Sequence, residues 1–473
     1  MKVCSPISEF NYKYPEKKLN ILHYTIGLNK NRGGGLTKYT DDLAIFQSYS
    51  NNVFLLYPGK INAINKKVFI KEEKKYQNVN IFSIVNPLGL PMMFGIRDMD
   101  YLTKKSDRRI WHDFLKKNKI DVIHMHTLMG IYEEFLDAAN ELKIPILYTT
   151  HDYFGLCSKQ TLFYNNEFCK EWKSCANCPR CNLTAFSKPK VLLIHSSLFF
   201  KLRKMSLFKK IKSKVKSNLN SNDDEKKKYY YDENEDYNQK YYINLRNKMI
   251  RMFDKISRLH YNSSNTRKIF ENFISKDKGV LINITHADIV DNRKIKDFNH
   301  QKLNITYLGP ATKMKGFNQL IDILDSIYNK SQNFNLNIYT FTNIERPYIT
   351  KHGNSYRYSD LKSIMEATDI LISPSTWMET FGFTVAEAMS FGVPVLVSEN
   401  TGAKDLVKDK FNGIIFSFEN LADIISNLVN NRKMLSTFNS NIFNDKFYLF
   451  EDHCNEITNL YYNMINLKNK EDS

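Results

Sequence analysis

The sequence lacks the features that define several classes of protein. It has no run of about 18 apolar residues, the length of a transmembrane helix, so no membrane span is predicted. The opening MKVCSPISEFNYKYPEKK has no apolar core of signal-peptide length, and we expect a cytoplasmic protein. The loop GGGLTK, after the first apolar run, lacks the G-x-G-x-x-G of a dinucleotide oxidoreductase. No helix-turn-helix, zinc-finger Cys/His pattern or aromatic RNA-binding signature is found.

Acidic residues are the minority among the charged ones. The chain of 473 residues has 68 Lys and Arg against 50 Asp and Glu, a net charge of +18. This balance favours nucleic acid, anionic lipid or phosphorylated substrates as partners. A basic nucleic-acid-binding protein is therefore one alternative. Because the motifs for that role are missing, we predict no nucleic-acid partner.

Apolar β-branched runs alternate with amphipathic helical stretches along most of the chain. Runs that are apolar on both faces indicate parallel strands covered on both sides by helices. One series opens with LNILHYTIG at 19–27, and a second opens with KGVLINI at 278–284. Two series predict an α/β protein with two doubly wound, Rossmann-like domains. We assign residues 1–285 to the first domain, 286–445 to the second and 446–473 to a helix that crosses back to the first.

Two segments of the first domain depart from this alternation. Residues 198–216 combine apolar positions at spacings of three and four with many lysines, in a stretch without any acid. This basic amphipathic pattern suits an anionic membrane surface; the alternative is a helix packed on the first domain. Residues 219–240 are poor in aliphatic side chains and crowded with charge, which predicts a disordered insertion.

Two strand ends in the second domain carry charged residues. In METFGFTVAEAMSFGVPVLVSE, Glu379 and Glu387 bracket a helix entrance that we expect near Thr384. The alternative is structural, because Thr384-x-x-Glu387 also fits a capping box. In GPATKMKG, Lys313 and Lys315 follow another strand; they could hold a diphosphate or simply form a solvated turn.

Together these motifs resemble a known family. The E-x7-E of ETFGFTVAEAMSFGVPVL is similar to that of retaining glycosyltransferases with the GT-B fold, of the family 4 type. GPATKMKG resembles the donor loop of that family, and RGGGLTKYTDDLA its glycine-rich first loop. DVIHMHT and ILYTTHDYFGLC resemble the strands near its active-site histidine. The resemblance spans nearly the whole chain, except about the first 15 residues and the insertion.

The resemblance implies roles for donor-binding residues of the second domain. Glu379 would contact the hydroxyls of the donor sugar, and Glu387 the ribose. Lys315 would neutralise the departing diphosphate. The backbone amides that would face the donor phosphates are those of Gly382, Phe383 and Thr384.

Further roles are implied on either side of the cleft between the domains. His151 would lie near the sugar, and Gly34 and Gly35 would let the first loop approach donor and acceptor. Pro310 stands where the family usually has an arginine, and Lys313 could supply the missing charge without the bidentate geometry of arginine. We interpret His124 and His126 as structural residues.

The implied reaction is hexosyl transfer from a UDP-, GDP- or ADP-sugar to a saccharide or lipid-linked acceptor, in cell-surface polysaccharide or lipopolysaccharide synthesis. Lys315 and the helix start would stabilise charge on the leaving diphosphate, so no catalytic metal is expected. No D-x-D motif ends a strand, and Asp41-Asp42 is expected on the helix after the glycine loop. A sugar-nucleotide epimerase or a phosphorylase of the same fold is the alternative.

Five of the seven cysteines lie between His151 and Leu183. In a cytosolic protein, C-x2-C spacing favours a metal over disulfides. We predict a structural zinc site, with an iron–sulfur cluster or unliganded cysteines as alternatives. Because related glycosyltransferases carry a similar insertion, its ligands would be Cys157, Cys169, Cys175 and Cys178, with Cys181 as an extra.

Overall fold

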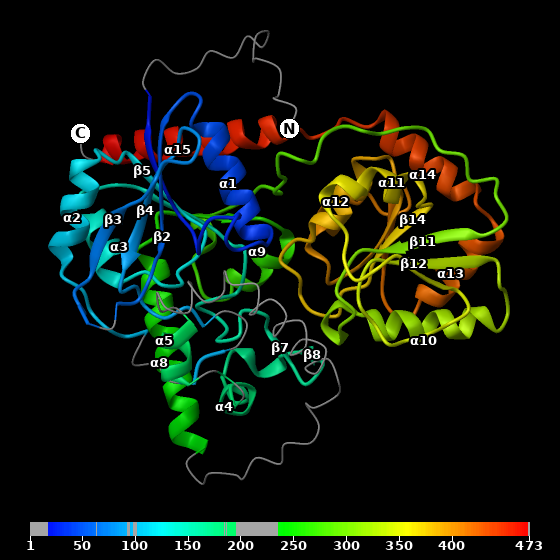
Figure 1. Cartoon of the computed structure of the whole chain (residues 1–473), viewed down its shortest axis with the longest axis horizontal. Coiled ribbons are helices and arrows are strands. Elements are labelled where there is room, and N and C mark those ends of the chain that lie inside the picture. The colour runs from blue at the N-terminus through cyan, green and yellow to red at the C-terminus, as the bar shows by residue number, and fades with distance from the viewer. Residues whose placement is uncertain are drawn as a thin grey trace.

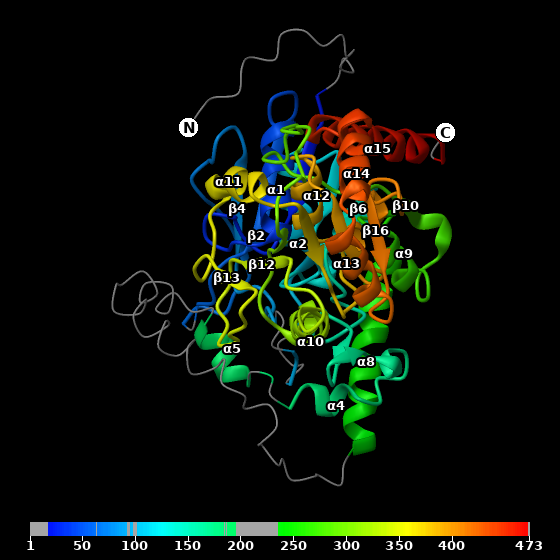
Figure 2. The same cartoon turned by 90° about the vertical axis from the view of Figure 1, so that its right-hand side faces the viewer.

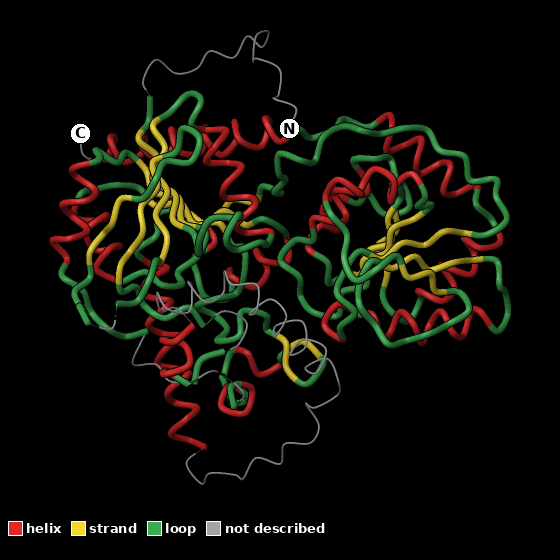
Figure 3. The backbone as a smooth tube through the Cα atoms, viewed as in Figure 1, coloured by secondary structure: helices red, strands yellow, loops and turns green. Residues whose placement is uncertain are grey.

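The computed structural model describes residues 18–62, 64–91, 95–97, 102–183, 185, 187–194 and 235–471. Most strands of these residues form two sheets, each in the centre of its own lobe with helices outside (Figures 1 and 3). The predicted α/β class with two doubly wound domains is confirmed. The basic segment 198–216 and residues 219–234 lie outside the described residues.

The first sheet has the strand order β10-β9-β6-β5-β1-β2-β4-β3. All its pairings are parallel except that of the edge strand β3 with β4. Strands β5 and β6 are buried at every position, as expected for a parallel sheet with helices on both faces. The strands are β1 (Asn20–Tyr24), β2 (Asn52–Pro58), β3 (Phe69–Glu72), β4 (Asn80–Val85), β5 (Val122–Met125), β6 (Ile146–Thr149), β9 (Arg258–Tyr261) and β10 (Gly279–Leu281).

The helices of this lobe are α1 (Gly35–Gln47), α2 (Arg108–Lys117), α3 (Glu133–Glu141), α4 (Cys178–Cys181), α5 (Lys188–Ile194), α8 (Glu235–Asp254) and α9 (Ser264–Phe270). A small hairpin joins β7 (Phe163–Tyr164) to β8 (Glu167–Phe168).

The second sheet is wholly parallel and has the order β13-β12-β11-β14-β15-β16. Its order reverses direction between β11 and β14, the place where ligands bind in open α/β sheets. The strands are β11 (Leu303–Tyr307), β12 (Phe334–Ile338), β13 (Ile349–Lys351), β14 (Ile370–Ser373), β15 (Val395–Ser398) and β16 (Gly413–Phe416). The helices are α10 (Phe317–Tyr328), α11 (Leu361–Glu366), α12 (Phe383–Met389), α13 (Leu421–Asn430) and α14 (Lys433–Asn444).

The fold settles one grouping and corrects one boundary. The run KGVLINI was grouped with the second series of strands although it falls within residues 1–285, and its strand β10 pairs with β9 at the edge of the first sheet. The insertion was predicted to extend to residue 240, but residues 235–240 already belong to α8. This helix forms despite its charged start because Tyr242, Leu245 and Met249 are buried on one side of it.

The last helix, α15 (Phe450–Glu471), returns from the second lobe to the first. It packs against α1, and the two helices lie at the same end of the first lobe in both views (Figures 1 and 2). Its buried residues include Ile457 and Tyr461. Within the described residues, none of the helices combines the length and the apolar character that a membrane crossing requires.

Candidate functional site

A tight turn places the two charged strand ends of the second lobe side by side. Lys313–Lys315 form one 3-10 turn after β11, which ends at Gly316 with a φ of 70°. A Cβ on Gly316 would lie 1.6 Å from the carbonyl oxygen of Pro374, directly after β14, so this close approach requires glycine. The turn brings the Nζ of Lys315 into contact with Oε1 of Glu379.

This ion pair lies in a sheltered environment. The side chain of Lys315 is 24% exposed and that of Glu379 is 9% exposed. The ammonium also lies 5.6 Å from the ring centroid of Trp377. Lys313, in contrast, is exposed, and its side chain has no interaction within the described residues. The structure therefore brings Lys315, and not Lys313, to the acid.

Two buried polar groups near Glu379 have no hydrogen-bond partner in the part of the chain that is described. They are the hydroxyl of Tyr153 and the Nε1 of Trp377. Burial, with a smaller contribution from the charge of Glu379, holds the pKa of Tyr153 well above its usual range. Because proteins pair nearly all their buried polar groups, two unpaired donors beside an acid indicate a place for a polar ligand.

Helix α12 begins beside the ion pair. Its N-cap is Gly382, with a φ of 108°, and no side chain caps the helix. Thr384 already lies inside the helix, so the capping-box alternative for Thr384 and Glu387 is wrong. Glu387 is 7% exposed and free of that structural role.

Glu387 instead faces aromatic side chains that the sequence did not predict. Its Oε1 lies 3.5 Å from Nε2 of His286. Burial and then the charge of Glu387 raise the pKa values of Tyr356 and Tyr358. The ring of His286 lies 5.7 Å from that of Tyr358, measured between centroids. The alternation Tyr356-Arg-Tyr358 ahead of a helix was the only local signal for this group.

The glycine loop of the first lobe meets α12 of the second. Gly34 is the N-cap of α1, and a Cβ on Gly35 would lie 3.0 Å from Cε2 of Phe383. The contact continues along α1, where Lys38 pairs with Asp288 at 2.7 Å. Asp41 and Asp42 lie within α1, as expected, and not at a strand end.

His151 follows β6 and faces the same region. Its backbone carbonyl accepts a 2.9 Å hydrogen bond from the hydroxyl of Thr380, next to Glu379. Its Nε2 lies 3.1 Å from Nδ1 of His126. Burial, with a contribution from the charge of His260, lowers the pKa of His151 to about 3, so the imidazole is neutral. His126, which we interpret as structural, is buried and directly contacts the predicted site histidine.

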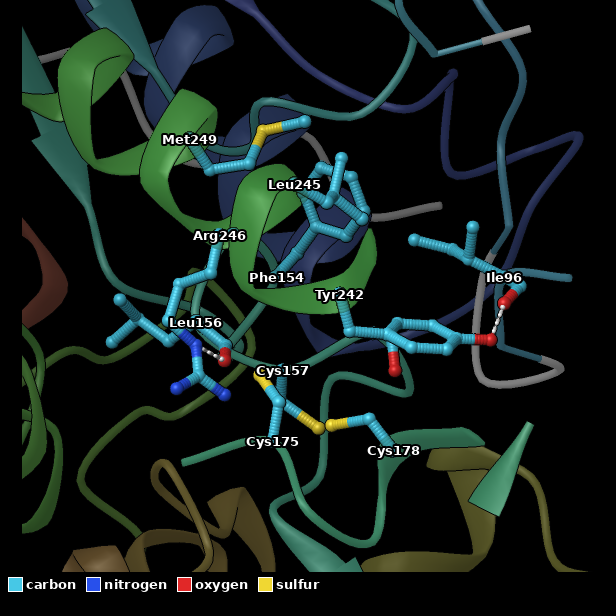
Figure 4. Close-up of a pocket in the computed structure, with 12 residues that line it drawn as sticks. Ile96, Phe154, Leu156, Cys157, Cys175, Cys178, Tyr242, Leu245, Arg246 and Met249 are labelled. Carbon is cyan, nitrogen blue, oxygen red and sulfur yellow. Dashed lines mark hydrogen bonds between the residues drawn. The ribbon is translucent and has the colours of Figure 1, made fainter. Parts of the chain in front are cut away.

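The cysteines predicted to bind zinc gather beneath α8. Cys157, Cys175 and Cys178 line one small cavity together with Arg246, and the sulfurs of Cys175 and Cys178 point toward each other (Figure 4). Burial and then the charge of Cys157 raise the pKa of Cys169 to about 11. Arg246 donates 3.0 Å and 2.7 Å hydrogen bonds to the carbonyls of Leu156 and Lys173, on both sides of the loop. Among the described residues, no three of these cysteines bring their sulfurs within 4.8 Å of one another, so the zinc site stays a prediction.

Comparison with known proteins matches the second lobe to a sequence family. Residues 346–445, which include Glu379 and Glu387, match the family model of the glycosyl transferases group 1. The capsular polysaccharide biosynthesis glycosyltransferase CapM of Staphylococcus aureus is 29% identical over 169 residues, 32% of this chain and 44% of that protein. The UDP-Gal:alpha-D-GlcNAc-diphosphoundecaprenol alpha-1,3-galactosyltransferase of Escherichia coli is 30% identical over 111 residues, 23% of this chain and 28% of that protein. The matched region thus spans less than half the length of either relative.

The fold is similar to that of solved structures over almost the whole chain. The crystal structure of a glycosyltransferase from Rickettsia africae superposes with a TM-score of 0.56 at 14% identity, and covers 95% of this chain and 99% of that one. Such a likeness at low identity shows the fold alone. The chain has the GT-B fold, with two Rossmann-like domains that face each other.

Proposed function

We propose that this chain is a glycosyltransferase that moves a sugar from a nucleotide-sugar donor to a saccharide or lipid-linked acceptor, with retention of configuration. The observation that carries the proposal is the contact between Lys315 and Glu379 at the switch point of the second sheet. Opposite this pair lie His151 and the glycine loop of the first lobe. The family match over residues 346–445 and the relatives involved in polysaccharide synthesis support the same class of reaction.

In this proposal the ion pair opens when the donor binds. The ammonium of Lys315 leaves Glu379 and contacts the diphosphate instead. The negative charge of the diphosphate grows as its bond to the sugar breaks. Glu379 is then free to accept hydrogen bonds from the sugar hydroxyls. The unpaired groups of Tyr153 and Trp377 provide two more donors beside it.

The rest of the donor lies along α12. The amides of Gly382, Phe383 and Thr384 face the phosphates, and Glu387 accepts from the ribose hydroxyls. The rings of Tyr356 and Tyr358 flank Glu387 and are suited to a nucleotide base. Because Lys315 supplies the cation, the transfer requires no divalent metal. Lys313, which is exposed, has at most a long-range effect on the phosphates.

The acceptor approaches from the first lobe, past Gly34 and Gly35. Cell-surface polysaccharide or lipopolysaccharide assembly fits the names of the relatives, one of which acts on a lipid diphosphate. A lipid-linked acceptor would bring a cytoplasmic enzyme to the inner membrane surface, where its net charge of +18 favours anionic lipid. We further propose that Cys157, Cys169, Cys175 and Cys178 hold a structural zinc ion that orders the loop after His151.

The test is a binding screen followed by a turnover assay. The purified chain is heated with UDP-, GDP- and ADP-sugars, and one base is expected to raise the melting temperature. With that donor and a lipid-linked acceptor, we expect a product with the anomeric configuration of the donor and an unchanged rate in the presence of chelator. No stabilisation by any donor, or donor cleavage that depends on phosphate instead of an acceptor, would contradict the proposal.

A further inference from the structure

A chain of buried hydrogen bonds runs from α15 through the first sheet to His151. Gln47 Nε2 lies 3.1 Å from Thr458 Oγ1, and Gln47 Oε1 lies 2.9 Å from Nε2 of His23. Nδ1 of His23 lies 3.1 Å from Nε2 of His126, whose Nδ1 lies 3.1 Å from Nε2 of His151. Gln47 is 1% exposed, and His23 and His126 are 0% exposed, so water does not compete for these bonds.

At the Thr458 end of this series of hydrogen bonds, the chemistry of the partners determines which group donates and which accepts. The hydroxyl of Thr458 donates to the carbonyl of Cys454 at 2.8 Å, so its oxygen can only accept from Gln47. The amide nitrogen of Gln47 therefore faces Thr458, and its carbonyl oxygen faces His23. That oxygen can only accept, which requires the proton of His23 on Nε2.

A second branch of hydrogen bonds, through His260 and His124, can be oriented in the same way. Nε2 of His260 lies 2.8 Å from the carbonyl oxygen of Ile282 and must donate to it. The hydroxyl of Thr149 then donates to Nδ1 of His260 at 2.8 Å and accepts from Nε2 of His124 at 2.6 Å. Nδ1 of His124 in turn accepts from the hydroxyl of Tyr461 at 2.6 Å. This branch therefore places the proton of His124 on Nε2, the same nitrogen that carries the proton of His23.

A neutral imidazole has one donor and one acceptor nitrogen. The donor in one hydrogen bond of the ring therefore determines which partner donates in the next bond. His23 donates from Nε2, so its Nδ1 accepts from Nε2 of His126. His126 then accepts at Nδ1 from Nε2 of His151. Burial lowers the pKa of His23 to about 4 and that of His126 well below its usual range, which keeps both rings neutral.

We propose that Gln47 and Thr458, through His23 and His126, hold the proton of His151 on Nε2 and leave its Nδ1 as a hydrogen-bond acceptor. Nδ1 has no partner within the described residues, and His151 is partly exposed. The group that Nδ1 recognises is a donor, the hydroxyl of a sugar, and not a phosphate or carbonyl oxygen. This last step rests on the proposed function. The four residues that act through His151 are positioning residues.

His23, His124 and His126 could alternatively be interpreted as metal ligands, because their ligand atoms all lie within 4.8 Å of one another. A metal would have to replace hydrogen bonds that already use both nitrogens of all three rings. The hydrogen-bonded network therefore explains the cluster better. Metal bound by these histidines would overturn the proposal.

The test determines which nitrogen of each histidine ring carries the proton, and it needs no substrate. Protein labelled with 15N-histidine is examined by NMR, which distinguishes protonated from unprotonated imidazole nitrogens. We expect the proton on Nε2 of His23, His124, His126, His151 and His260. Gln47→Met, which removes both polar atoms, should make exchange of the His151 proton with water about tenfold faster, the effect of one buried hydrogen bond.

Two results would overturn the proposal. One is a proton on Nδ1 of His151 or of His23 in the unaltered protein. The other is a folded Gln47→Met protein whose His151 signals match those of the unaltered protein. If Gln47→Met does not fold, the spectrum of the unaltered protein still decides. Because no sugar is added, failure here is distinct from failure to transfer a glycosyl group.

Discussion

The two sides of the cleft are built from different chemistry. On the second lobe, charged side chains stand on short turns at strand ends, where Lys315 contacts Glu379. On the first lobe, the neutral and buried His23 and His124 lie on the adjacent strands β1 and β5, His126 directly follows β5, and His151 follows β6. The charged side chains of the second lobe can respond to a charged ligand by changing partners. The histidines of the first lobe are held in place by hydrogen bonds on both sides of each ring.

This difference suggests a division of labour within the proposed reaction. The charged side handles the diphosphate, whose charge changes during transfer, and so it needs a cation that can move. The neutral side presents a fixed acceptor to sugar hydroxyls, whose charge does not change. If the comparison is right, substitutions on the charged side should affect rate, and those on the neutral side should affect proton positions and acid stability.

Lys315→Ala should have the largest effect. Loss of the cation aimed at the leaving diphosphate is expected to lower kcat by about 10²–10³-fold, the effect of removing one preorganised group at a site of developing charge. Steady-state kinetics with the donor found in the binding screen measures this. The free energy of unfolding should change less than the activation free energy, because the ammonium is 24% exposed, although Glu379 is then left 9% exposed without its cation.

Lys313→Ala is the matched control for that experiment. It removes the same charge two residues away, from a side chain without interactions in the described structure. Its kcat should stay close to that of the unaltered protein. Equal losses in both variants would show that general positive potential, and not the position of Lys315, assists the reaction.

Cys178→Ser tests whether the first lobe also contains a concentrated charge, away from the cleft. A zinc ion on four thiolates has a net charge of −2, which Arg246 beside the cavity would partly balance. We expect about one zinc per chain in the unaltered protein and little in Cys178→Ser, measured by elemental analysis after purification without a tag.

Cys181→Ser is the control for the cysteine experiment, because Cys181 is the extra cysteine of the loop. It should retain the zinc and the melting temperature. A metal content near zero in the unaltered protein would remove the zinc proposal and leave five free thiols. The proposed transfer reaction would not be affected by that outcome.

The charged side could be predicted from the sequence to a greater extent than the neutral side. Glu379 and Lys315 each sit in a short motif between a strand and a helix, and local periodicity places such residues at strand ends. Their contact depends on the strand order β11-β14, which the pattern of a doubly wound sheet implies. Gly316, in the same motif, explains how close the two turns come.

The neutral side could not be predicted in this way. His23 and His126 are 103 residues apart and meet only because β1 and β5 are neighbours in the sheet. Gln47 and Thr458 are 411 residues apart and meet only because α15 returns to the first lobe. No local pattern specifies such pairs, so the sequence could not predict the hydrogen bonds of His126, which was interpreted as a structural residue. Likewise, His286 meets Glu387 through the arrangement of distant segments.

The smallest effect concerns acid stability and depends on the buried histidines. Burial lowers the pKa values of His23 and His260 from 6.5 to about 4. Between these values the unfolded chain binds protons that the folded chain does not, so the free energy of unfolding falls as pH falls from 6.5 toward 4. Each such group contributes up to about 1.4 kcal/mol per pH unit. Asp41 and Asp152 have the opposite effect on the free energy of unfolding. Burial raises their pKa values to about 6, so as the pH falls the folded chain binds these protons before the unfolded chain does.

The histidines outnumber these two carboxyls, so the net result is lower stability in acid. Denaturant unfolding at pH 7 and pH 5 should show a loss that is smaller in His23→Gln by about 1–2 kcal/mol, because one proton-binding group is removed from the unfolded chain. His352→Gln, in the second lobe, is the control and should lose as much as the unaltered protein. The readout is the difference between the two pH values, so a constant cost of replacing a core residue cancels. An equal acid loss in all three proteins would mean that His23 binds its proton at the same pH in the folded and the unfolded state, which would contradict the lowered pKa of the buried ring.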